Sequence, residues 1–315
     1  MTRPDSGPGA TDVLAAAARI GGVVRRTPLL AVDALPAILL KAEHLQLGGS
    51  FKTRGAANAM LAGNARAVVA GSSGNHGIAL ATLGRQLGVE VTVVMAGGAS
   101  AAKAATLRSL GARVLQVPGG VVERDRYACE HAARTGAALI PSSDHDLVVA
   151  GQGTVGLEVF TDAPEIDLIF VPTGGGGLLA GICLAATCLA TPVRIVGVEP
   201  AHGRRYARSL AAARPVELPP PDTIADGLRG QRPGVVPFPI IRQRVDELIG
   251  VTDESITSAM NLLHGAGIAA EPTGSVALAG ALQFGAAGRA VAVVSGGNTL
   301  AAPPAPHGAM SAFAH

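Results

Sequence analysis

Aromatic residues are scarce in this sequence, which has no tryptophan, two tyrosines and six phenylalanines among its 315 residues. We therefore expect alanine and valine, rather than aromatic side chains, to fill most of the interior. Charged residues make up only 15% of the chain, whereas 48% of the residues are hydrophobic. This composition predicts a mostly ordered chain that folds as one large domain or two of ordinary size.

Strong charge of one sign, paired cysteines and long hydrophobic runs are also missing. The net charge is +2 and the basic residues are scattered, which argues against nucleic acid as a partner. The three cysteines form no C-x-x-C pair, and we interpret them as core residues in a reducing compartment. No run of about 18 apolar residues predicts a membrane span, and the N-terminus lacks the apolar segment of a signal peptide. We therefore expect a cytoplasmic protein with no membrane partner.

Short apolar runs of strand length alternate with helical patterns through most of the chain. The predicted strands cover residues 38–43, 67–70, 91–95, 114–117, 138–140, 168–171, 195–198, 248–251 and 290–294. The predicted helices cover residues 13–20, 78–87, 101–110, 175–190, 203–213, 254–265 and 273–285. The proline-rich segment 214–239 is expected to be irregular, and residues 1–10 and those beyond 300 to be disordered. This alternation predicts an α/β protein of two lobes in close contact, each a mostly parallel sheet flanked by helices.

A lysine in the sequence SFKTRGA, at residues 50–56, is the first candidate for chemistry. A lone lysine, Lys52, beside serine, threonine and arginine is most often a solvated surface residue. Three other segments change this interpretation, because each follows a predicted strand: SSGNHG at 72–77, GGGG at 174–177 and SGGN at 295–298. Ligands of parallel α/β sheets bind at the carboxyl ends of the strands.

Each of these segments offers a different kind of contact. Four glycines before an apolar helix let backbone N–H groups close on an anion, and four glycines are costly in entropy for a simple turn. Residues 72–77 can hold a carboxylate, although alone they would be a capped helix start with His76 as a structural donor. No GxxxxGK[ST] or GxGxxG spacing indicates a nucleotide. A lysine, an anion site and a carboxylate site together are what pyridoxal phosphate and an amino acid require.

With these motifs in this order, the sequence resembles the fold-type II pyridoxal-phosphate enzymes, in particular the serine/threonine dehydratase and serine racemase family. Further shared motifs are RTPL at 26–29, AGQGT at 150–154, GVEP at 197–200, TIADG at 223–227 and EPTG at 271–274. The resemblance implies the tryptophan synthase β-like fold. It also implies a large cofactor-binding domain, residues 1–55 and 146–315, and a small mobile domain, residues 56–145.

The resemblance implies roles for individual residues. Lys52 would carry pyridoxal 5′-phosphate as a Schiff base and then take the Cα proton, between Phe51 and Gly227 on the two faces of the ring. The other implied cofactor contacts are Asn75, Gly174, Gly175, Gly176, Gly177 and Ser295, the last at the ring nitrogen. The implied substrate-carboxylate contacts are Ser72, Ser73, Gly74, Asn75 and His76. Ser73 is a second catalytic candidate, because racemase-type members use a serine there to reprotonate the opposite face.

The implied reaction is β-elimination of a β-hydroxy-α-amino acid such as L-serine or L-threonine, which gives a 2-oxo acid and ammonia. A racemase or β-replacement synthase of the same fold is the alternative within the family. A non-enzymatic protein that binds a small anion is the alternative outside it. The partner implied is a small-molecule amino acid, and a homodimer is the family expectation.

Two departures from the family pattern concern a metal and the substrate. Racemase-like members often bind a divalent cation at positions that correspond to Glu199, Gly203 and Arg205, and an arginine cannot ligate such an ion. We therefore expect no metal, with the Arg205 cation paired with Glu199 in its place. The loop 118–124 does not match the polar residues implied around the substrate side chain of serine racemases. The accepted side chain is left open.

Overall fold

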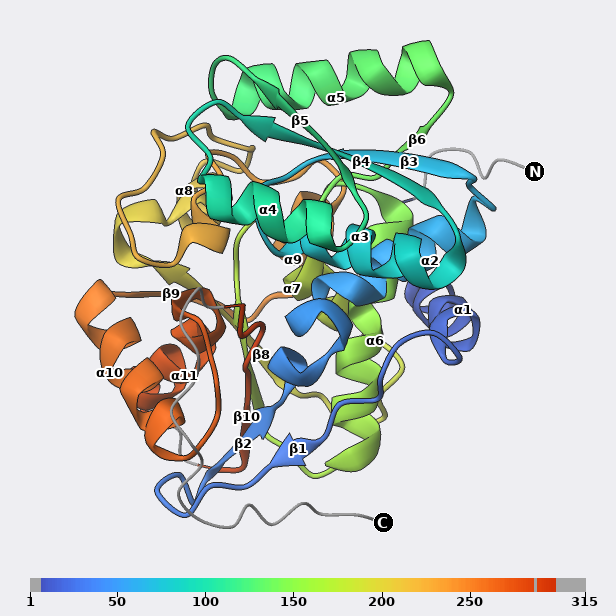
Figure 1. Ribbon diagram of the computed structural model, residues 1–315. Coiled ribbons are helices and arrows are strands. Elements are labelled where there is room, and N and C mark those ends of the chain that lie inside the picture. Colours follow the sequence, from blue (N-terminus) through green and yellow to red (C-terminus); the bar gives the residue numbers. More distant parts are fainter. Residues whose placement is uncertain (1–6, 286–287, 299–315) are drawn as a thin grey trace.

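The computed structural model describes residues 7–285 and 288–298 (Figure 1). One sheet has the strand order β1-β2-β10-β7-β8-β9, and the other has the order β5-β4-β3-β6. In the first sheet β1 runs antiparallel to β2 and the remaining strands are parallel. The second sheet is parallel throughout. The predicted α/β fold of two mostly parallel sheets is therefore confirmed.

The nine predicted strands are present with bounds within two residues of the predicted ones, and the two-residue β1 was not predicted as a strand. The larger sheet contains β1 (Leu29–Leu30), β2 (Ile38–Lys41), β7 (Leu168–Pro172), β8 (Arg194–Pro200), β9 (Glu247–Val251) and β10 (Ala290–Val293). The smaller sheet contains β3 (Ala67–Gly71), β4 (Glu90–Ala96), β5 (Arg113–Val117) and β6 (Ala138–Leu139). The smaller sheet thus comes from one continuous part of the chain. The domain bounds at 55/56 and 145/146, and the mobility of the small domain, stay predictions.

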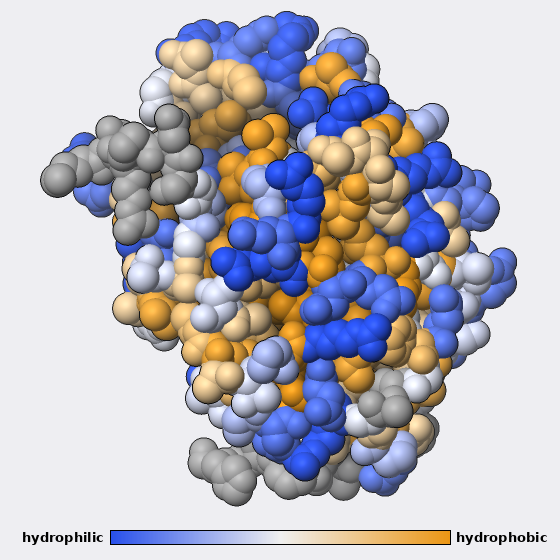
Figure 2. Space-filling view, turned by 180° about the vertical axis from the view of Figure 1, so that it is seen from behind, coloured by the Kyte–Doolittle hydropathy of each residue, from blue (hydrophilic) through white to orange (hydrophobic). Residues whose placement is uncertain are grey.

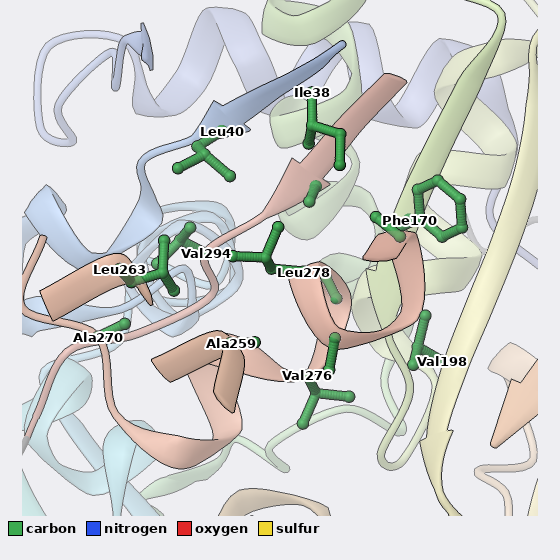
Figure 3. Packing of buried hydrophobic residues seen from close by; sticks show 14 of the residues in the cluster. Ile38, Leu40, Phe170, Val198, Ala259, Leu263, Ala270, Val276, Leu278 and Val294 are labelled. Atoms are coloured by element: carbon green, nitrogen blue, oxygen red, sulfur yellow. The ribbon is translucent and has the colours of Figure 1, made fainter. Parts of the chain in front are cut away.

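Helices cover both faces of the larger sheet because strand residues alternate between two cores. Phe170 and Val198 pack with α10 (Asp253–Gly265) and α11 (Pro272–Phe284) on one face (Figure 3). Ile169 and Val171 pack on the other face with α6 (Asp146–Asp162), α7 (Gly177–Ala186) and α9 (Pro237–Arg244). Small residues let these helices approach closely, since a Cβ at Gly181 on α7 would overlap the backbone of Gly153 on α6. The prediction of a core packed mainly by small aliphatic residues is confirmed.

The smaller sheet lies in the upper part of Figure 1, with α5 on the side away from the larger sheet. Its other helices are α2 (Lys52–Ala62), α3 (Asn75–Leu87) and α4 (Ala101–Ser109), and α5 spans Val121–Thr135. The short helices η1 (Glu43–Leu45) and η2 (Leu47–Gly49) lead from β2 to α2. None of the helices in the described ranges is long and apolar enough to cross a membrane.

Several predicted segments differ from the structure. The helix expected at 203–213 is a 3-10 turn, η3 (Ala201–Gly203), followed by the short α8 (Arg205–Ala211). The loop expected at 118–124 ends at Gly120, and α5 begins at the next residue. The Glu123 carboxylate accepts the Gly120 N–H and so caps the start of this helix. The irregular segment 214–239 contains η4 (Asp226–Leu228) and the start of α9. At the N-terminus α1 (Ala10–Ile20) begins inside the expected disorder, and the tail beyond 300 lies outside the described residues.

Candidate active site

The segments singled out in the sequence meet where the two sheets face one another. The run Gly174–Gly177 follows β7, the SGGN segment follows β10, and the SSGNHG segment joins β3 to α3. Lys52 is the first residue of α2, which lies between the sheets (Figure 1). An isolated bridge pairs Ser50 with Gly296, and the Phe51 N–H donates to the Ser295 carbonyl at 3.1 Å. The lysine segment is therefore fastened to the end of β10.

Lys52 has the environment of a reactive amine. Its Nζ donates a 2.8 Å hydrogen bond to the carbonyl oxygen of Ser142 and lies 4.9 Å from the centre of the Phe51 ring. No carboxylate pairs with it among the described residues. Burial lowers the pKa of Lys52 to about 8, so a fraction of the amine is neutral at physiological pH.

The other two lysines of the chain are committed elsewhere. Lys41 is fully buried in an ion pair with Glu158 at 2.6 Å, and Lys103 pairs with Asp226 at 2.8 Å. Lys52 is therefore the lysine whose amine is available to react with a carbonyl compound.

The glycine run presents unpaired backbone donors. Within the described chain, the N–H groups of Gly174, Gly175 and Gly176 donate to no protein acceptor. Side chains cannot be added here, because a Cβ at Gly175 would overlap the Ser143 hydroxyl and one at Gly176 would overlap the Tyr206 hydroxyl. Gly176 also has a φ of 94°, in the left-handed region that favours glycine. Free donors at the start of α7 form a site for an anion such as a phosphate group.

Contacts between the segments close into a ring. Lys52 bonds Ser142, and the neighbouring Ser143 packs against Gly175. Gly174 packs against Gly227 and Leu228 of the TIADG segment. The Gly227 N–H donates to the Thr273 hydroxyl at 3.1 Å, and the buried Ser295 hydroxyl donates to the Thr273 carbonyl at 3.4 Å. The Ser295 carbonyl accepts the N–H of Phe51, the residue before Lys52. The series of contacts therefore begins and ends at the lysine segment.

The SSGNHG segment has donors without a protein partner in the part of the chain that the structure describes. The Ser72 hydroxyl accepts the N–H groups of Gly74 and Gly77, at 3.3 and 3.2 Å, and so caps the start of α3. Its own O–H, and the N–H and hydroxyl of the half-buried Ser73, have no partner within the described chain. These groups can hold a carboxylate.

His76 is held as a neutral structural side chain. Its Nε2 bonds the Ile140 carbonyl at 2.8 Å, an oxygen that only accepts, so the N–H lies on Nε2 and Nδ1 carries a lone pair. Burial, together with the charge of Lys52, lowers the pKa of His76 to about 3. Nδ1 cannot donate to a carboxylate in this tautomer, which favours the structural interpretation; the role of His76 in substrate binding stays a prediction.

Glu271 belongs to the site although the sequence assigned it no role. Its Oε1 accepts the Asn75 amide at 2.5 Å, and the Asn75 oxygen accepts from Asn298 at 2.9 Å. Asn298 also donates to the Gly48 carbonyl at 2.8 Å. Burial raises the pKa of Glu271 to about 7. These hydrogen bonds orient the Asn75 side chain. The EPTG motif is the sequence signal from which a role for Glu271 could have been inferred.

Comparison with known proteins assigns this arrangement to a family. The family described as "Pyridoxal-phosphate dependent enzyme" matches residues 20–296. The L-threo-3-hydroxyaspartate ammonia-lyase of Saccharomyces cerevisiae is 39% identical, over 91% of this chain and 92% of that protein. The serine racemase of Oryza sativa subsp. indica is 36% identical, over 85% of this chain and 82% of that protein. A solved T.th. threonine deaminase is 40% identical with a TM-score of 0.86, and the match covers 94% of this chain and 100% of that one.

This chain belongs to the pyridoxal-phosphate-dependent enzymes. Its place is in the serine/threonine dehydratase and serine racemase group, as the order of motifs predicted, and its cofactor is pyridoxal 5′-phosphate. The residues present fit that cofactor, because one uncommitted lysine stands in the same ring as three unpaired N–H groups suited to a phosphate. The individual roles of Lys52, Ser73 and the other site residues stay predictions.

An ion network beside the first turn of α2, which begins with Lys52, was missed in the sequence. It consists of Lys41, Glu43, Arg54 and Glu158, all buried or nearly so. The Arg54 guanidinium bonds both oxygens of Glu43 and both oxygens of Glu158, at 2.7 to 2.8 Å. Bidentate pairs of this kind fix orientation as well as distance. Arg54 lies two residues after Lys52, so the network fixes the first turn of the helix that carries the lysine.

The predicted pairing of Arg205 with Glu199 takes a different form. The Glu199 oxygens accept the N–H groups of Tyr206 and Ala207, at 2.9 and 3.0 Å, and the Arg205 guanidinium donates to the Leu228 carbonyl. Glu199 therefore caps α8, while Arg205 holds the segment next to Gly227.

Proposed function

We propose that this enzyme is an ammonia-lyase for a β-hydroxy-α-amino acid, which it converts to a 2-oxo acid and ammonia. The observation that carries the proposal is the ring that encloses Lys52, with anion donors at Gly174–Gly176 and carboxylate donors at Ser72 and Ser73. Relatives named ammonia-lyases, 38% and 39% identical over most of the chain, support this reaction class.

The residues of the site divide the work of the reaction. Bound pyridoxal phosphate supplies an electron-withdrawing ring that stabilises the charge left at Cα when its proton departs. Lys52 Nζ takes that proton, which requires a neutral amine, and a pKa of about 8 leaves roughly a tenth of the amine neutral at pH 7. The Ser72 hydroxyl and the hydroxyl and N–H of Ser73 hold the substrate carboxylate.

Ser295 favours elimination over side reactions. Its side chain is a neutral hydroxyl and not a carboxylate, so it would place no negative charge beside the ring nitrogen of bound pyridoxal phosphate. Without such a charge the ring nitrogen would not be held protonated, and the ring would withdraw electrons less strongly. We expect this weaker withdrawal to favour prompt loss of the β-hydroxyl group over transamination.

Racemisation is the second candidate activity. Ser73 is half-buried, and its hydroxyl has no hydrogen-bond partner within the described chain. The resemblance places this hydroxyl opposite Lys52, from where it would return a proton to the other face of Cα. Conversion of L-serine to D-serine that disappears in Ser73→Ala, while ammonia release remains, would support this activity.

Arg124 at the start of α5 is our candidate for selecting the substrate side chain. Gly71, which precedes the SSGNHG segment, packs against the Asp125 carboxylate and the Arg124 guanidinium. The charge of Arg124 contributes to the lowered pKa of His76, after burial and Lys52. The side chain is 18% exposed and its nearest anion is the more exposed Asp125. We propose that Arg124 accepts an acidic side chain, such as that of 3-hydroxyaspartate.

Substrate profiling tests the reaction and its selectivity together. Purified enzyme with added pyridoxal phosphate is incubated with L-serine, D-serine, L-threonine and L-threo-3-hydroxyaspartate, and ammonia and 2-oxo acid are measured. We expect both products, lost in Lys52→Ala. Arg124→Gln should raise KM for hydroxyaspartate by roughly tenfold or more and change KM for threonine little. Arg126→Gln, an exposed position on the same helix, should leave both unchanged.

Residues 56–145 form a mobile small domain in our proposal. Lys103 on α4 and Asp226 beside Gly227 form a 2.8 Å ion pair between this domain and the rest of the chain, and both side chains are partly exposed. Such pairs contribute at most about 1 kcal/mol, so this contact can open and close. X-ray scattering should give a smaller radius of gyration with a substrate analogue bound, and an unchanged radius would argue for a rigid chain.

A homodimer is our proposal for the assembly. Figure 2 shows hydrophobic residues exposed over the central part of the face opposite to that of Figure 1, with groups of hydrophilic residues between them. Extended apolar surfaces on a protein mark contact sites. Light scattering coupled to size-exclusion chromatography should give twice the 31.3 kDa chain mass, and a mass equal to one chain would refute the dimer.

A further inference from the structure

Arg205 is a buried cation at the end of the larger sheet. Its side chain is fully buried, and its guanidinium donates to the Leu228 carbonyl and packs between Gly203 and Gly230. Two of its donors, Nε and Nη1, have no partner within the described chain. The carboxylate whose charge acts on Arg205 is Glu199, which is also fully buried. These two buried side chains carry opposite charges, and the exposed Arg204 also acts on Glu199.

The residues here do not fit the divalent cation that the resemblance implies. Mg²⁺ and Ca²⁺ require about six to eight oxygen ligands, mostly carboxylates, carbonyls and water. The three family positions supply one carboxylate, the carbonyl of Gly203 and a guanidinium that repels a cation. A divalent ion beside Arg205 and Glu199 would leave two uncompensated positive charges in a buried region. In the described ranges, no group of three or more acidic, histidine or cysteine residues could hold a metal.

We infer that the Arg205 guanidinium replaces a structural metal ion and positions the segment 226–230 against the cofactor site. Through Leu228 it fixes the neighbouring Gly227, which packs against Gly174 of the anion-binding loop and bonds Thr273. The Arg205 guanidinium is part of the protein chain, so a chelator cannot remove it as it would remove a metal ion. Arg205 is a positioning residue, because it touches the segment that lines the site and not the reacting atoms.

The charge balance makes the replacement reversible by a single substitution. Arg205→Asp places two buried carboxylates, those of residues 199 and 205, beside the Gly203 carbonyl, and a divalent cation neutralises that pair. Arg205→Asn has nearly the same shape with one charge fewer, so it is the matched control. Arg205→Lys keeps the charge and loses the planar donor group.

Metal content, thermal stability and activity of the wild type and these variants test the inference. After dialysis against EDTA, wild type should retain no stoichiometric divalent metal, and Mg²⁺, Mn²⁺ or Ca²⁺ should change neither its Tm nor its activity. Arg205→Asp should gain Tm and bind about one ion per chain when metal is added. Its activity should rise roughly ten- to a hundredfold with metal, whereas Arg205→Asn should not respond. Arg205→Lys should stay indifferent to metal and bind pyridoxal phosphate more weakly.

Several results would overturn the inference. They are one divalent ion per chain in dialysed wild type, loss of wild-type activity in EDTA that Mg²⁺ restores, or equal responses of the Asp and Asn variants to metal. If neither of these two variants folds, metal analysis of wild type and of Arg205→Lys decides the question. Metal content and Tm require no turnover, so failure of the proposed reaction is distinguishable from failure of this inference.

Discussion

Replacing Arg54 by methionine tests whether the buried ion network holds the helix that carries the cofactor lysine. The Arg54 guanidinium is fully buried and bonds all four carboxylate oxygens of Glu43 and Glu158. Lys41 provides the second cation, so the network is electrically balanced. Methionine keeps most of the aliphatic volume but leaves Lys41 alone with two buried carboxylates. We therefore expect a large loss of stability from charge rather than from packing.

The size of the stability loss in Arg54→Met follows from the burial of the ion network. The direction in which this loss changes with pH follows from the pKa of Glu158. Removing one partner of a buried ion pair costs about 3 to 5 kcal/mol, and we expect a loss in this range at pH 8. Burial raises the pKa of Glu158, and the bonds and charges of Arg54 and Lys41 together outweigh burial and lower that pKa. Arg54 makes the larger contribution, so in the variant we expect the folded-state pKa to lie above the unfolded one, and stability to be lost as pH rises through it. The variant should therefore recover about 1 kcal/mol or more, relative to wild type, between pH 8 and pH 5.

Urea unfolding followed by far-ultraviolet circular dichroism measures this change, because the chain has no tryptophan to report by fluorescence. Pyridoxal phosphate is held at one saturating concentration, since ligand binding itself shifts stability. Arg126→Met, in an exposed pair with Glu130, is the control and should cost less than about 0.5 kcal/mol. Adding Glu158→Gln to Arg54→Met restores charge balance and should recover stability. An Arg54→Met loss below about 1 kcal/mol at every pH, or no recovery in the double variant, would refute the reasoning.

Three further predictions concern titrating groups of the site. Because burial lowers the pKa of Lys52 to about 8, the rate at which apoprotein captures pyridoxal phosphate, trapped by borohydride, should rise with pH to about 8 and then level. A rate that keeps rising well beyond that pH would indicate an ordinary lysine. Burial lowers the pKa of His76 from 6.5 to about 3, so stability should fall as pH drops below 6.5. By about pH 4.5 this loss should reach about 2 to 3 kcal/mol, and His76→Gln should not show it in urea titrations. Burial raises the pKa of Glu271 to about 7, so its carboxyl contributes stability at low pH that is lost as pH rises through 7. Glu271→Gln should be more stable than wild type at about pH 8, by up to about 3 kcal/mol, and an equal difference at about pH 5 would contradict this.

The fold and the position of the site were predictable because their signals are local in sequence. Apolar runs of strand length separated by helical patterns specify parallel sheets, and segments that follow such strands gather at one edge. The bonds of Phe51 to Ser295 and of Gly227 to Thr273 link motifs that the sequence had already identified. The family and the cofactor followed from the order of these motifs and are confirmed.

The missed features depend on pairs of residues far apart in sequence. Arg54 meets Glu158 more than a hundred residues later, and no local pattern shows that a surface-type arginine will be buried. Asn75 is the first residue of α3, and Glu271 directly precedes α11. The two side chains meet only because the fold brings the starts of these two helices together. The helix α9 was obscured by its prolines, although proline is well tolerated in the first turn of a helix.

Borohydride reduction of the enzyme with bound pyridoxal phosphate, followed by digestion and peptide mass spectrometry, tests the central claim most directly. The chain has three lysines, so each possible attachment site gives a distinct peptide. We expect the reduced cofactor on Lys52 in wild type, and no labelled peptide in Lys52→Ala. Attachment to Lys41 or Lys103 in the wild type, or no attachment at all, would contradict the assignment of this site.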